Sequence, residues 1–224
     1  MQNHTVSRRD MLKLTGLATV FGLFTPIFHV FPVQAAEKQG KKSLIVYFSM
    51  PETDNPHNMS REEENSTVVI NGKVLGNTQY VAQLIQEMTG GDIFRILPQK
   101  PYPTDHRTLV DLAREEQKQD TRPAIVGKIE APEVYDTIFI GYPNWWGDMP
   151  MILYTFLEQY DFSGKTLIPF CTHGGSGFSR TIRTMQDKQP GATVIRNGYA
   201  LSRSRMERAP SGVAGWLKEI GLKK

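Results

Sequence analysis

Short apolar runs alternate with amphipathic stretches along the chain between residues 43 and 220. The apolar runs are rich in β-branched and aromatic residues and are too short for helices, so they predict buried strands. The longer stretches place apolar residues at helical spacing, as Val81, Leu84, Ile85 and Met88 do, and predict amphipathic helices. Strands that alternate with helices are typical of an α/β fold, in which helices cover both faces of a parallel sheet.

The predicted elements follow one another in regular order. Strands are expected at residues 43–48, 92–97, 137–141, 166–171 and 193–199. Helices are expected from Gly76-Asn77-Thr78 to residue 88, and at residues 105–120, 150–159, 179–188 and 211–220. Pro169 lies in the fourth strand, where a residue without an N–H group predicts a bulge or a strand end.

Residues 51–75 form an insertion between the first strand and the helix that follows it. The segment is polar at its start and contains the charge run Glu62-Glu63-Glu64. Residues 67–75 predict a hairpin with Asn71-Gly72 as its turn. Two interpretations carry equal weight, because loops of this length are usually functional or disordered. The insertion is either a flap or partner-docking surface at a binding site, or a solvated excursion beside the sheet.

The amino-terminal segment, residues 1–35, has a different character from the rest of the chain. Arg8-Arg9, flanked by Ser7 and Lys13, precede a mainly apolar run, and small residues follow before Ala36. This order resembles a twin-arginine export signal that is cleaved ahead of Ala36. The alternative is an uncleaved membrane anchor. Prolines interrupt the run, and its length is near the lower limit of about 17 residues for a membrane span, which favours cleavage.

An export signal of this kind predicts where the protein works and what it carries. It indicates a periplasmic or otherwise exported protein whose mature domain spans residues 36–224, with membrane contact only through an uncleaved signal. Because twin-arginine systems move proteins that are already folded, the signal also favours a cofactor bound before export. Cys171 is the only cysteine, so the chain forms no intramolecular disulfide.

Charge and histidine spacing exclude two classes of function. The chain has 26 Lys and Arg against 23 Asp and Glu, and residues 1–35 hold three of the former and one of the latter. The mature part therefore has a net charge of +1, which does not support nucleic-acid binding. His57, His106 and His173 show no metal-ligand spacing, so we predict no metal site.

The loops after the first and fourth strands carry candidate phosphate- and ring-binding residues. In an open α/β sheet, ligands bind beyond the carboxyl ends of the strands. Ser49-Met50 follow the first strand, and Gly76-Asn77-Thr78 form a helix start, where backbone amides and hydroxyls favour a phosphate. Thr172-His173-Gly174-Gly175-Ser176-Gly177 follow the fourth strand, and glycines there permit close approach of the backbone to a ring. His173 either contacts the ring edge or is an ordinary polar loop residue.

The loop after the third strand is the most informative segment of the chain. It reads Pro143-Asn144-Trp145-Trp146-Gly147 and lies in a Gly- and Pro-rich turn. Two adjacent tryptophans in a surface turn indicate a binding surface for a flat ligand. The alternative is that one tryptophan only plugs the end of the sheet. Arg203, Arg205 and Arg208 form a small basic group that either binds an acidic partner or nucleotide or, more simply, is a solvated face.

Taken in order on one sheet, these three loops resemble those of the flavodoxin family over residues 42–221. The resemblance rests on Ser49-Met50 with Gly76-Asn77-Thr78, on Gly-Tyr-Pro-x-Trp-Trp-Gly, and on Phe-Cys-Thr-x-Gly-Gly-Ser-Gly. It implies an α/β, flavodoxin-like five-stranded parallel sheet in order 2-1-3-4-5, with helices on both faces and FMN at the switch point.

The resemblance also implies roles for individual residues. Ser49, Asn77 and Thr78 would hold the phosphate, and Trp145 or Trp146 would stack on the isoalloxazine. Gly147 resembles the flexible glycine whose peptide turns its carbonyl toward the reduced ring, and Gly174 and Gly175 would line the other ring edge. The remaining expected cofactor-binding residues are Met50, Gly76, Pro143, Asn144, Thr172, His173 and Gly177.

The sequence thus predicts an exported FMN-binding electron-transfer protein, in which the protein supplies position and electrostatics and the flavin supplies redox chemistry. Its partner would be a redox protein or a small electron acceptor. One alternative is an NAD(P)H-dependent quinone, azo or flavin reductase of the same fold, and another is a flavin-binding module without turnover. A Gly-x-Gly-x-x-Gly nicotinamide fingerprint is absent from the sequence, but reductases of this fold can bind nicotinamide directly over the flavin.

Overall fold

A parallel β-sheet forms the centre of the computed structural model, which describes residues 42–222. The strands lie in the order β10-β8-β7-β1-β4, and β9 also pairs with β8. Because β9 and β10 both pair with β8, they share the fifth position, and the predicted order 2-1-3-4-5 is confirmed. The bounds are β1 Lys42–Tyr47, β4 Asp92–Arg95, β7 Tyr135–Pro143, β8 Thr166–His173, β9 Thr193–Val194 and β10 Tyr199–Ser202.

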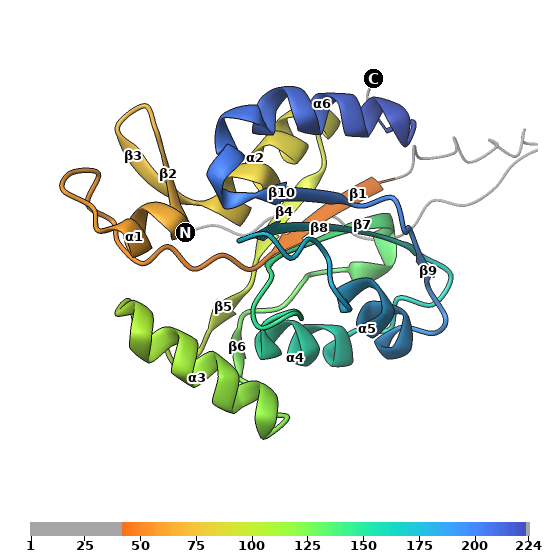
Figure 1. Cartoon of the computed structure of the whole chain (residues 1–224). Coiled ribbons are helices and arrows are strands. Elements are labelled where there is room, and N and C mark those ends of the chain that lie inside the picture. Colours follow the sequence, from red (N-terminus) through yellow and green to blue (C-terminus); the bar gives the residue numbers. More distant parts are fainter. Residues whose placement is uncertain (1–41, 223–224) are drawn as a thin grey trace, which may run out of the picture. The chain divides into compact units, whose positions relative to one another are not determined.

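Helices cover both faces of this sheet (Figure 1). One layer contains α2 and α6, and the other contains α4 and α5, with α3 alongside α4. Side chains of β1 alternate between the two layers: Leu44 and Val46 pack on the α4 side, and Ile45 and Tyr47 pack on the α2 side. The bounds are α2 Asn77–Thr89, α3 His106–Lys118, α4 Met151–Gln159, α5 Thr181–Lys188 and α6 Ala209–Glu219.

The fifth strand is divided opposite Pro169. The expected strand at 193–199 is replaced by the short strands β9 and β10, with a break between them. Pro169 itself pairs in register with Ile140 inside β8, so the predicted bulge or strand end at that residue is wrong. The irregularity lies instead in the neighbouring strand, because Pro169 has no N–H group to donate to it. Gly198 packs against the Pro169 carbonyl oxygen at the break.

Smaller elements connect the main ones. The predicted second strand, 92–97, ends at Arg95, and Leu97 begins a separate antiparallel pair. That pair is β5 Leu97–Pro98 with β6 Ile125–Val126, and the two 3₁₀ helices are η1 Pro132–Val134 and η2 Arg203–Arg208.

Among residues 42–222, no helix has the length and apolar character needed to cross a membrane. The predicted signal, residues 1–35, and its boundary with the mature domain lie outside the described residues.

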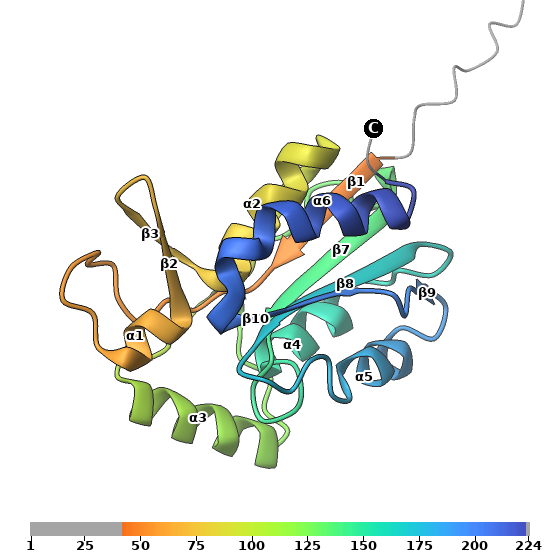
Figure 2. The same cartoon turned by 45° about the horizontal axis from the view of Figure 1, so that its top comes forward.

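The insertion forms a short helix and a hairpin beside α2 (Figure 2). The predicted hairpin is confirmed as β2 Thr67–Ile70 and β3 Lys73–Gly76. Asn71 and Gly72 have φ angles of 51° and 75°, as a type I′ turn requires. The charge run lies in α1, Arg61–Ser66, which begins with a capping box between Ser60 and Glu63. Its acidic residues lie in the first turn, where the helix dipole stabilises negative charge.

Candidate functional site

A cavity of about 490 Å³ lies at the carboxyl ends of β1, β7 and β8. This volume is within the range of about 300–1,000 Å³ that small-molecule sites occupy. The structure brings eleven of the fifteen predicted site residues to its walls. They are Ser49, Met50, Asn77, Thr78, Pro143, Asn144, Trp145, Trp146, Thr172, His173 and Gly174.

The insertion loops out and leaves the two parts of the first loop in contact. Ser49 follows β1 and is 5% exposed, and Gly76 lies directly against its hydroxyl. A Cβ atom at Gly76 would overlap Ser49 Oγ, so a larger residue at this position would require Ser49 to move. Asn77 and Thr78 begin α2 immediately afterwards and line the cavity. The positive end of the α2 dipole therefore lies at the cavity wall.

A pair of buried hydroxyls joins the first loop to the third. Thr78 Oγ1 and Thr172 Oγ1 are 2.7 Å apart, and the two residues are 1% and 5% exposed. Two hydroxyls that share one hydrogen bond use only one of their two protons. The other proton remains available to an acceptor in the cavity.

Asn77 presents an unsatisfied acceptor at the same place. Its Nδ2 donates to the Asn65 carbonyl oxygen at 2.8 Å, which fixes the orientation of the amide. Its Oδ1 is buried and accepts no hydrogen bond within residues 42–222. A buried acceptor without a donor is costly, so this atom favours a ligand that carries a hydroxyl or N–H group.

Asn144 fastens the second loop to the third. Its backbone N–H donates to the Thr172 carbonyl oxygen at 2.8 Å, and its Nδ2 donates to the Gly177 carbonyl oxygen at 2.8 Å. Its Oδ1 accepts the Gly147 N–H at 3.1 Å. Asn144 therefore positions both loops as well as lining the cavity.

Four predicted glycines do not line the cavity. Gly76 supports Ser49 from behind. Gly147, with φ 77°, donates to Asn144 and directs its carbonyl oxygen to the Arg180 N–H at 3.4 Å, away from the role expected of it. Gly175 donates its N–H to His173 Nδ1 at 3.0 Å. The Gly177 carbonyl oxygen accepts a hydrogen bond from Asn144 Nδ2. The last three have positive φ angles, which the turns of these loops require.

Trp145 and Trp146 pack against different parts of the protein. They belong to a two-residue turn in which the backbones of Trp145 and Asp148 exchange hydrogen bonds of 2.9 and 3.0 Å. Trp145 packs edge-on against Phe48 and Tyr102, with ring centroids 5.6 and 5.7 Å apart. Trp145 therefore packs largely at the end of the sheet, as the alternative interpretation expected.

Trp146 reaches across to α3. Its side chain is 49% exposed, its Nε1–H donates to the Val110 carbonyl oxygen at 3.0 Å, and the Arg114 guanidinium lies 4.9 Å from its ring centroid. Its φ angle is 53°, a left-handed conformation that is unusual for a bulky residue. Such a conformation costs about 1–2 kcal/mol, which these contacts offset.

Sequence reasoning missed one wall of the cavity. One face of α3, formed by His106, Leu109, Val110 and Ala113, lines it, and we call these four residues the α3 face. Their spacing is that of a helix face packed on a core, so the pattern alone gave no reason to assign them to a site. Part of the insertion completes the wall, and its residues there are Glu52, Asn65 and Ser66.

Glu52 and His106 form a pair within this wall. His106 Nδ1 lies 3.0 Å from both carboxylate oxygens of Glu52, and Glu52 is 8% exposed. Burial raises the pKa of Glu52 above its ordinary value, and the hydrogen bond with His106 offsets part of this increase. The Glu52 N–H donates to Ser66 Oγ at 2.9 Å and ties this residue to the rest of the insertion.

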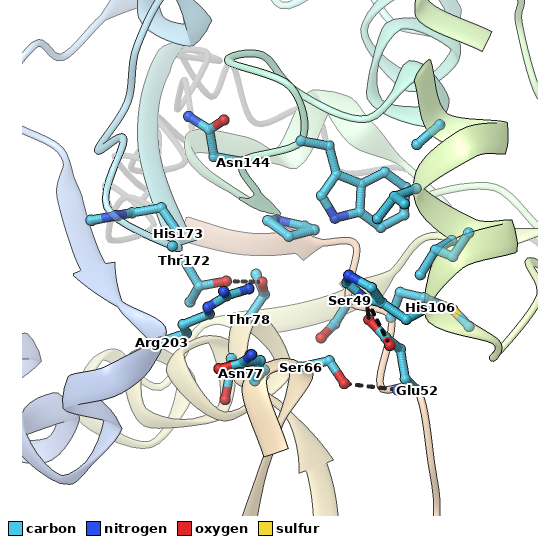
Figure 3. Close-up of a pocket in the computed structure, with 18 of the residues that line it drawn as sticks. Ser49, Glu52, Ser66, Asn77, Thr78, His106, Asn144, Thr172, His173 and Arg203 are labelled. Atoms are coloured by element: carbon cyan, nitrogen blue, oxygen red, sulfur yellow. Dashed lines mark hydrogen bonds and ion pairs between the residues drawn. The ribbon is translucent and has the colours of Figure 1, made fainter. Parts of the chain in front are cut away.

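Arg203 supplies positive charge to the cavity. It lies beside Thr78 and Thr172, while Glu52 and His106 lie at the other side (Figure 3). Its guanidinium packs over Gly174, where an added Cβ would lie 3.3 Å from Arg203 Cζ. Arg203 is therefore exposed to solvent, as the simpler interpretation expected, and also lines the cavity. Desolvation lowers the pKa of His173, whose Nδ1 accepts the Gly175 N–H, so this ring is neutral with its proton on Nε2.

A family model described as Flavodoxin matches residues 67–220, which is more than half of the chain. The chain belongs to the flavodoxin family. None of the curated proteins compared with this flavodoxin-family chain matches it significantly. Residues 42–222 of this family member contain no group of three or more His, Cys, Asp or Glu side chains arranged to hold a metal ion.

Solved structures of similar proteins have the same fold. A protein from Bacteroides uniformis, provisionally designated a flavoprotein, is 30% identical over 79% of this chain and 99% of its own, with a TM-score of 0.59. A second, from Bacteroides eggerthii and also provisionally designated, is 27% identical over 81% and 99%, with a TM-score of 0.61. A flavoprotein from Lactobacillus acidophilus, solved in complex with FMN, is 21% identical over 75% and 97%, with a TM-score of 0.53.

Proposed function

We propose that the protein binds FMN non-covalently in this cavity and transfers electrons. One observation carries the proposal: three loops and a helix N-terminus converge on a single cavity with a polar, positively charged side and an aromatic side. Membership of the flavodoxin family supports it, and the Lactobacillus acidophilus flavoprotein of the same fold was solved with FMN. When bound, FMN would supply the redox chemistry.

The residues at the polar side fit a phosphate. The α2 N-terminus, Ser49 and the spare proton of the Thr78–Thr172 pair offer donors, and Arg203 offers a full positive charge. Helix N-termini favour anions through exposed N–H groups and the helix dipole. These groups would hold the phosphate and compensate its charge.

The remaining walls fit the ribityl chain and the ring. Among the described residues, none donates to Asn77 Oδ1, and a ribityl hydroxyl would provide this donor. Trp145 and Trp146 give the cavity aromatic walls, and His173 offers a neutral N–H group. In this protein the partly buried walls would orient the flavin and exclude water from one side of it.

The cofactor proposal is tested by comparing FMN with riboflavin, which lacks the phosphate. Acid should release FMN from the purified protein, and Arg203→Met should weaken FMN binding by about 10–150-fold, the equivalent of a lost charge-assisted hydrogen bond of about 1.5–3 kcal/mol. Riboflavin affinity should stay unchanged, and Arg205→Met, at an exposed position in the same basic group, is the control. Equal losses for both flavins would remove Arg203 from the phosphate site, and absence of flavin binding would overturn the proposal.

Electron transfer is tested by anaerobic mixing with NADH or NADPH. A carrier that receives its electrons from a protein partner should react slowly with either nucleotide. Rapid oxidation of NAD(P)H, with transfer to an added acceptor, would replace the carrier with a reductase of the same fold.

We also propose that the protein is exported through the twin-arginine route. Arg8-Arg9 and the apolar run that follows support this, and both lie outside the described residues. Replacing both arginines by lysine should leave the folded, flavin-loaded precursor in the cytoplasm. Undiminished periplasmic delivery of that variant would contradict the proposal.

A further inference from the structure

A second cavity lies on another face of α3, and we call the cavity described above the FMN cavity. The second cavity has a volume of about 730 Å³, within the range of about 300–1,000 Å³ that small-molecule sites occupy. It lies between α3 and the two segments that join this helix to β5 and β6, residues 99–103 and 121–124 (Figure 1). It shares no residue with the FMN cavity, so the proposed function leaves it unexplained.

The surface of the second cavity is mostly apolar. Pro101, Pro103 and Pro123 line it, together with Leu112 and the buried ring of Tyr102. Proline has no N–H group, so three of these residues contribute no backbone hydrogen-bond donor to the walls. A ligand with an apolar body that brings its own donors fits such a surface.

Glu116 places a half-buried carboxylate in the second cavity. The Tyr102 hydroxyl donates to its Oε2 at 2.9 Å, which fixes the orientation of the carboxylate. Within residues 42–222, no Lys, Arg or His forms an ion pair with Glu116. Burial raises the pKa of Glu116, and the hydrogen bond with Tyr102 offsets part of this increase. The carboxylate therefore lies partly out of water without a cation that compensates its charge.

The two positively charged residues at the same walls do not compensate it. Arg122 donates from Nε and Nη2 to Glu158, at 2.6 and 3.0 Å, and from Nη1 to Asp120 at 2.8 Å. Its guanidinium is thus held by two other carboxylates. Lys100 is exposed to solvent. Glu116 is left as the charged group of the second cavity that lacks an opposite charge.

We propose that the second cavity binds a small organic cation, an amine with an apolar or aromatic body, and that Glu116 pairs with its ammonium group. The ammonium supplies the positive charge that the carboxylate lacks, and its N–H groups supply donors that the prolines do not. The body packs on the prolines and Leu112. A metal ion fits less well, because residues 42–222 contain no three His, Cys, Asp or Glu side chains arranged to hold one.

Tyr102 lies between the two cavities and allows a clean test of the charge. Its ring packs edge-on against Phe48 and Trp145, with centroids 5.6 and 5.7 Å apart, and its hydroxyl donates to Glu116. The variant Glu116→Gln keeps an acceptor for this hydroxyl, so Tyr102 and Trp145 should keep their positions. The variant therefore removes the charge from the second cavity, and FMN binding serves as a check on the fold.

Binding is tested with three small molecules that differ in charge. Phenethylamine carries an ammonium group, 2-phenylethanol has a hydroxyl in its place, and phenylacetate carries a carboxylate. In calorimetric titrations of the protein with excess FMN, phenethylamine should bind at least about 10-fold more tightly than 2-phenylethanol, as a charge-assisted hydrogen bond predicts, and phenylacetate should bind most weakly. Equal affinities for the amine and the alcohol, or no binding of the amine at millimolar concentration, would overturn the proposal.

Two neighbouring carboxylates of α3 then identify the group that binds the amine. In Glu116→Gln the affinity for phenethylamine should fall at least about 10-fold, to that for 2-phenylethanol, while the affinity for the alcohol stays unchanged. Glu115→Gln is the control: Glu115 is exposed and pairs with Lys118 at 3.7 Å, so its loss should weaken amine binding less than about 5-fold. Equal losses in the two variants would mean general attraction to an acidic surface and would overturn the assigned site.

A second pair of variants blocks the cavity without a change of charge, and decides the question if Glu116→Gln does not fold. Leu112→Trp should fill the cavity and abolish measurable phenethylamine binding. Val126→Trp makes a comparable change on β6, at a position that is 51% exposed and outside the cavity, and should leave binding unchanged. Loss of binding in both variants, or in neither, would contradict the proposed location.

FMN fluorescence, followed in the same titrations, separates the two cavities. Phenethylamine should bind without releasing FMN. Release of FMN by the amine would place the amine in the FMN cavity, which would overturn this inference and leave the proposed function standing. Absence of FMN binding together with the expected phenethylamine binding would overturn the proposed function and still support the cation site.

Discussion

The cavity has two sides that are built in different ways. We call the loops after β1, β7 and β8, with the α2 N-terminus, the loop side, and the α3 face with Glu52 the helix side. Backbone groups and short polar side chains hold the loop side together, through the Thr78–Thr172 pair and the three hydrogen bonds of Asn144. Long side chains hold the helix side, through Glu52 with His106 and Trp146 with α3.

Because of this difference, the two sides are not held equally firmly. Each loop of the loop side is linked to another by a short hydrogen bond, so its geometry is set before any ligand binds, as tight cofactor binding requires. The helix side is attached to the loop side through Trp146, whose contact with Arg114 is worth about 0.5–1 kcal/mol at an exposed site. The helix side is therefore attached to the loop side less firmly than the three loops are attached to one another.

The largest expected effect separates the two adjacent tryptophans. Trp145→Ala should destabilise the fold by about 3 kcal/mol, because it removes a large ring packed on Phe48 and Tyr102. Trp146→Ala should cost about 1 kcal/mol, since it loses one hydrogen bond and one cation–π contact at an exposed site. Urea unfolding of both variants measures the difference. Equal costs would mean that Trp146 is as much a part of the core as Trp145, and that the helix side is fixed firmly.

The next effect concerns the hydroxyl pair of the loop side. Thr78→Val or Thr172→Val alone should cost about 1–3 kcal/mol of stability, because the remaining hydroxyl is buried without its partner. The double variant should cost clearly less than the sum of the two, since two apolar groups of the same shape replace both partners. Urea unfolding gives the stabilities, and titration with FMN should show weaker binding in all three variants. Strictly additive stabilities would contradict the direct pairing of these hydroxyls.

The loop side was largely predictable from sequence because its signals are local. The Gly- and aromatic-rich turns of β7 and β8 directly follow their buried strands in sequence, and the strand order came with the family resemblance. The glycines were harder to interpret: Gly147, Gly175 and Gly177 have the positive φ angles that turns need, and the same residue type also marks close approach to a ligand. Sequence alone does not separate the two causes.

The helix side was not predictable because its contacts are remote in sequence. Glu52 and His106 are 54 positions apart, and nothing in a polar insertion distinguishes one glutamate from the others. The helical spacing of Leu109 and Ala113 is the same whether that face packs on a core or lines a cavity. Arg203 is one of three arginines in a basic group, and the sequence does not distinguish it from the other two. Only its packing over Gly174 in the structure assigns it to the site.

The smallest expected effect concerns the charge that holds the helix side. A carboxyl whose pKa is raised in the folded state, as burial raises that of Glu52, binds its proton more tightly when folded than when unfolded. The stability it contributes is therefore full below its unfolded pKa, near 4.5, and is lost as pH rises through the folded value. The stability of the parent relative to Glu52→Gln should fall with rising pH in that window. One proton limits this slope to about 1.4 kcal/mol per pH unit.

Urea unfolding of the parent and Glu52→Gln at intervals from pH 4 to 6 measures this slope, and Glu64→Gln, at an exposed position of α1, is the control. A parent that gains stability over Glu52→Gln as pH rises would mean that the attraction of His106 outweighs the burial of the carboxylate. The Glu52–His106 pair would then stabilise the fold at neutral pH, and the helix side would be held by a favourable ion pair as the loop side is held by its hydrogen bonds. A falling difference instead identifies Glu52 as a carboxylate kept buried at a cost to stability, an arrangement that is common at functional sites.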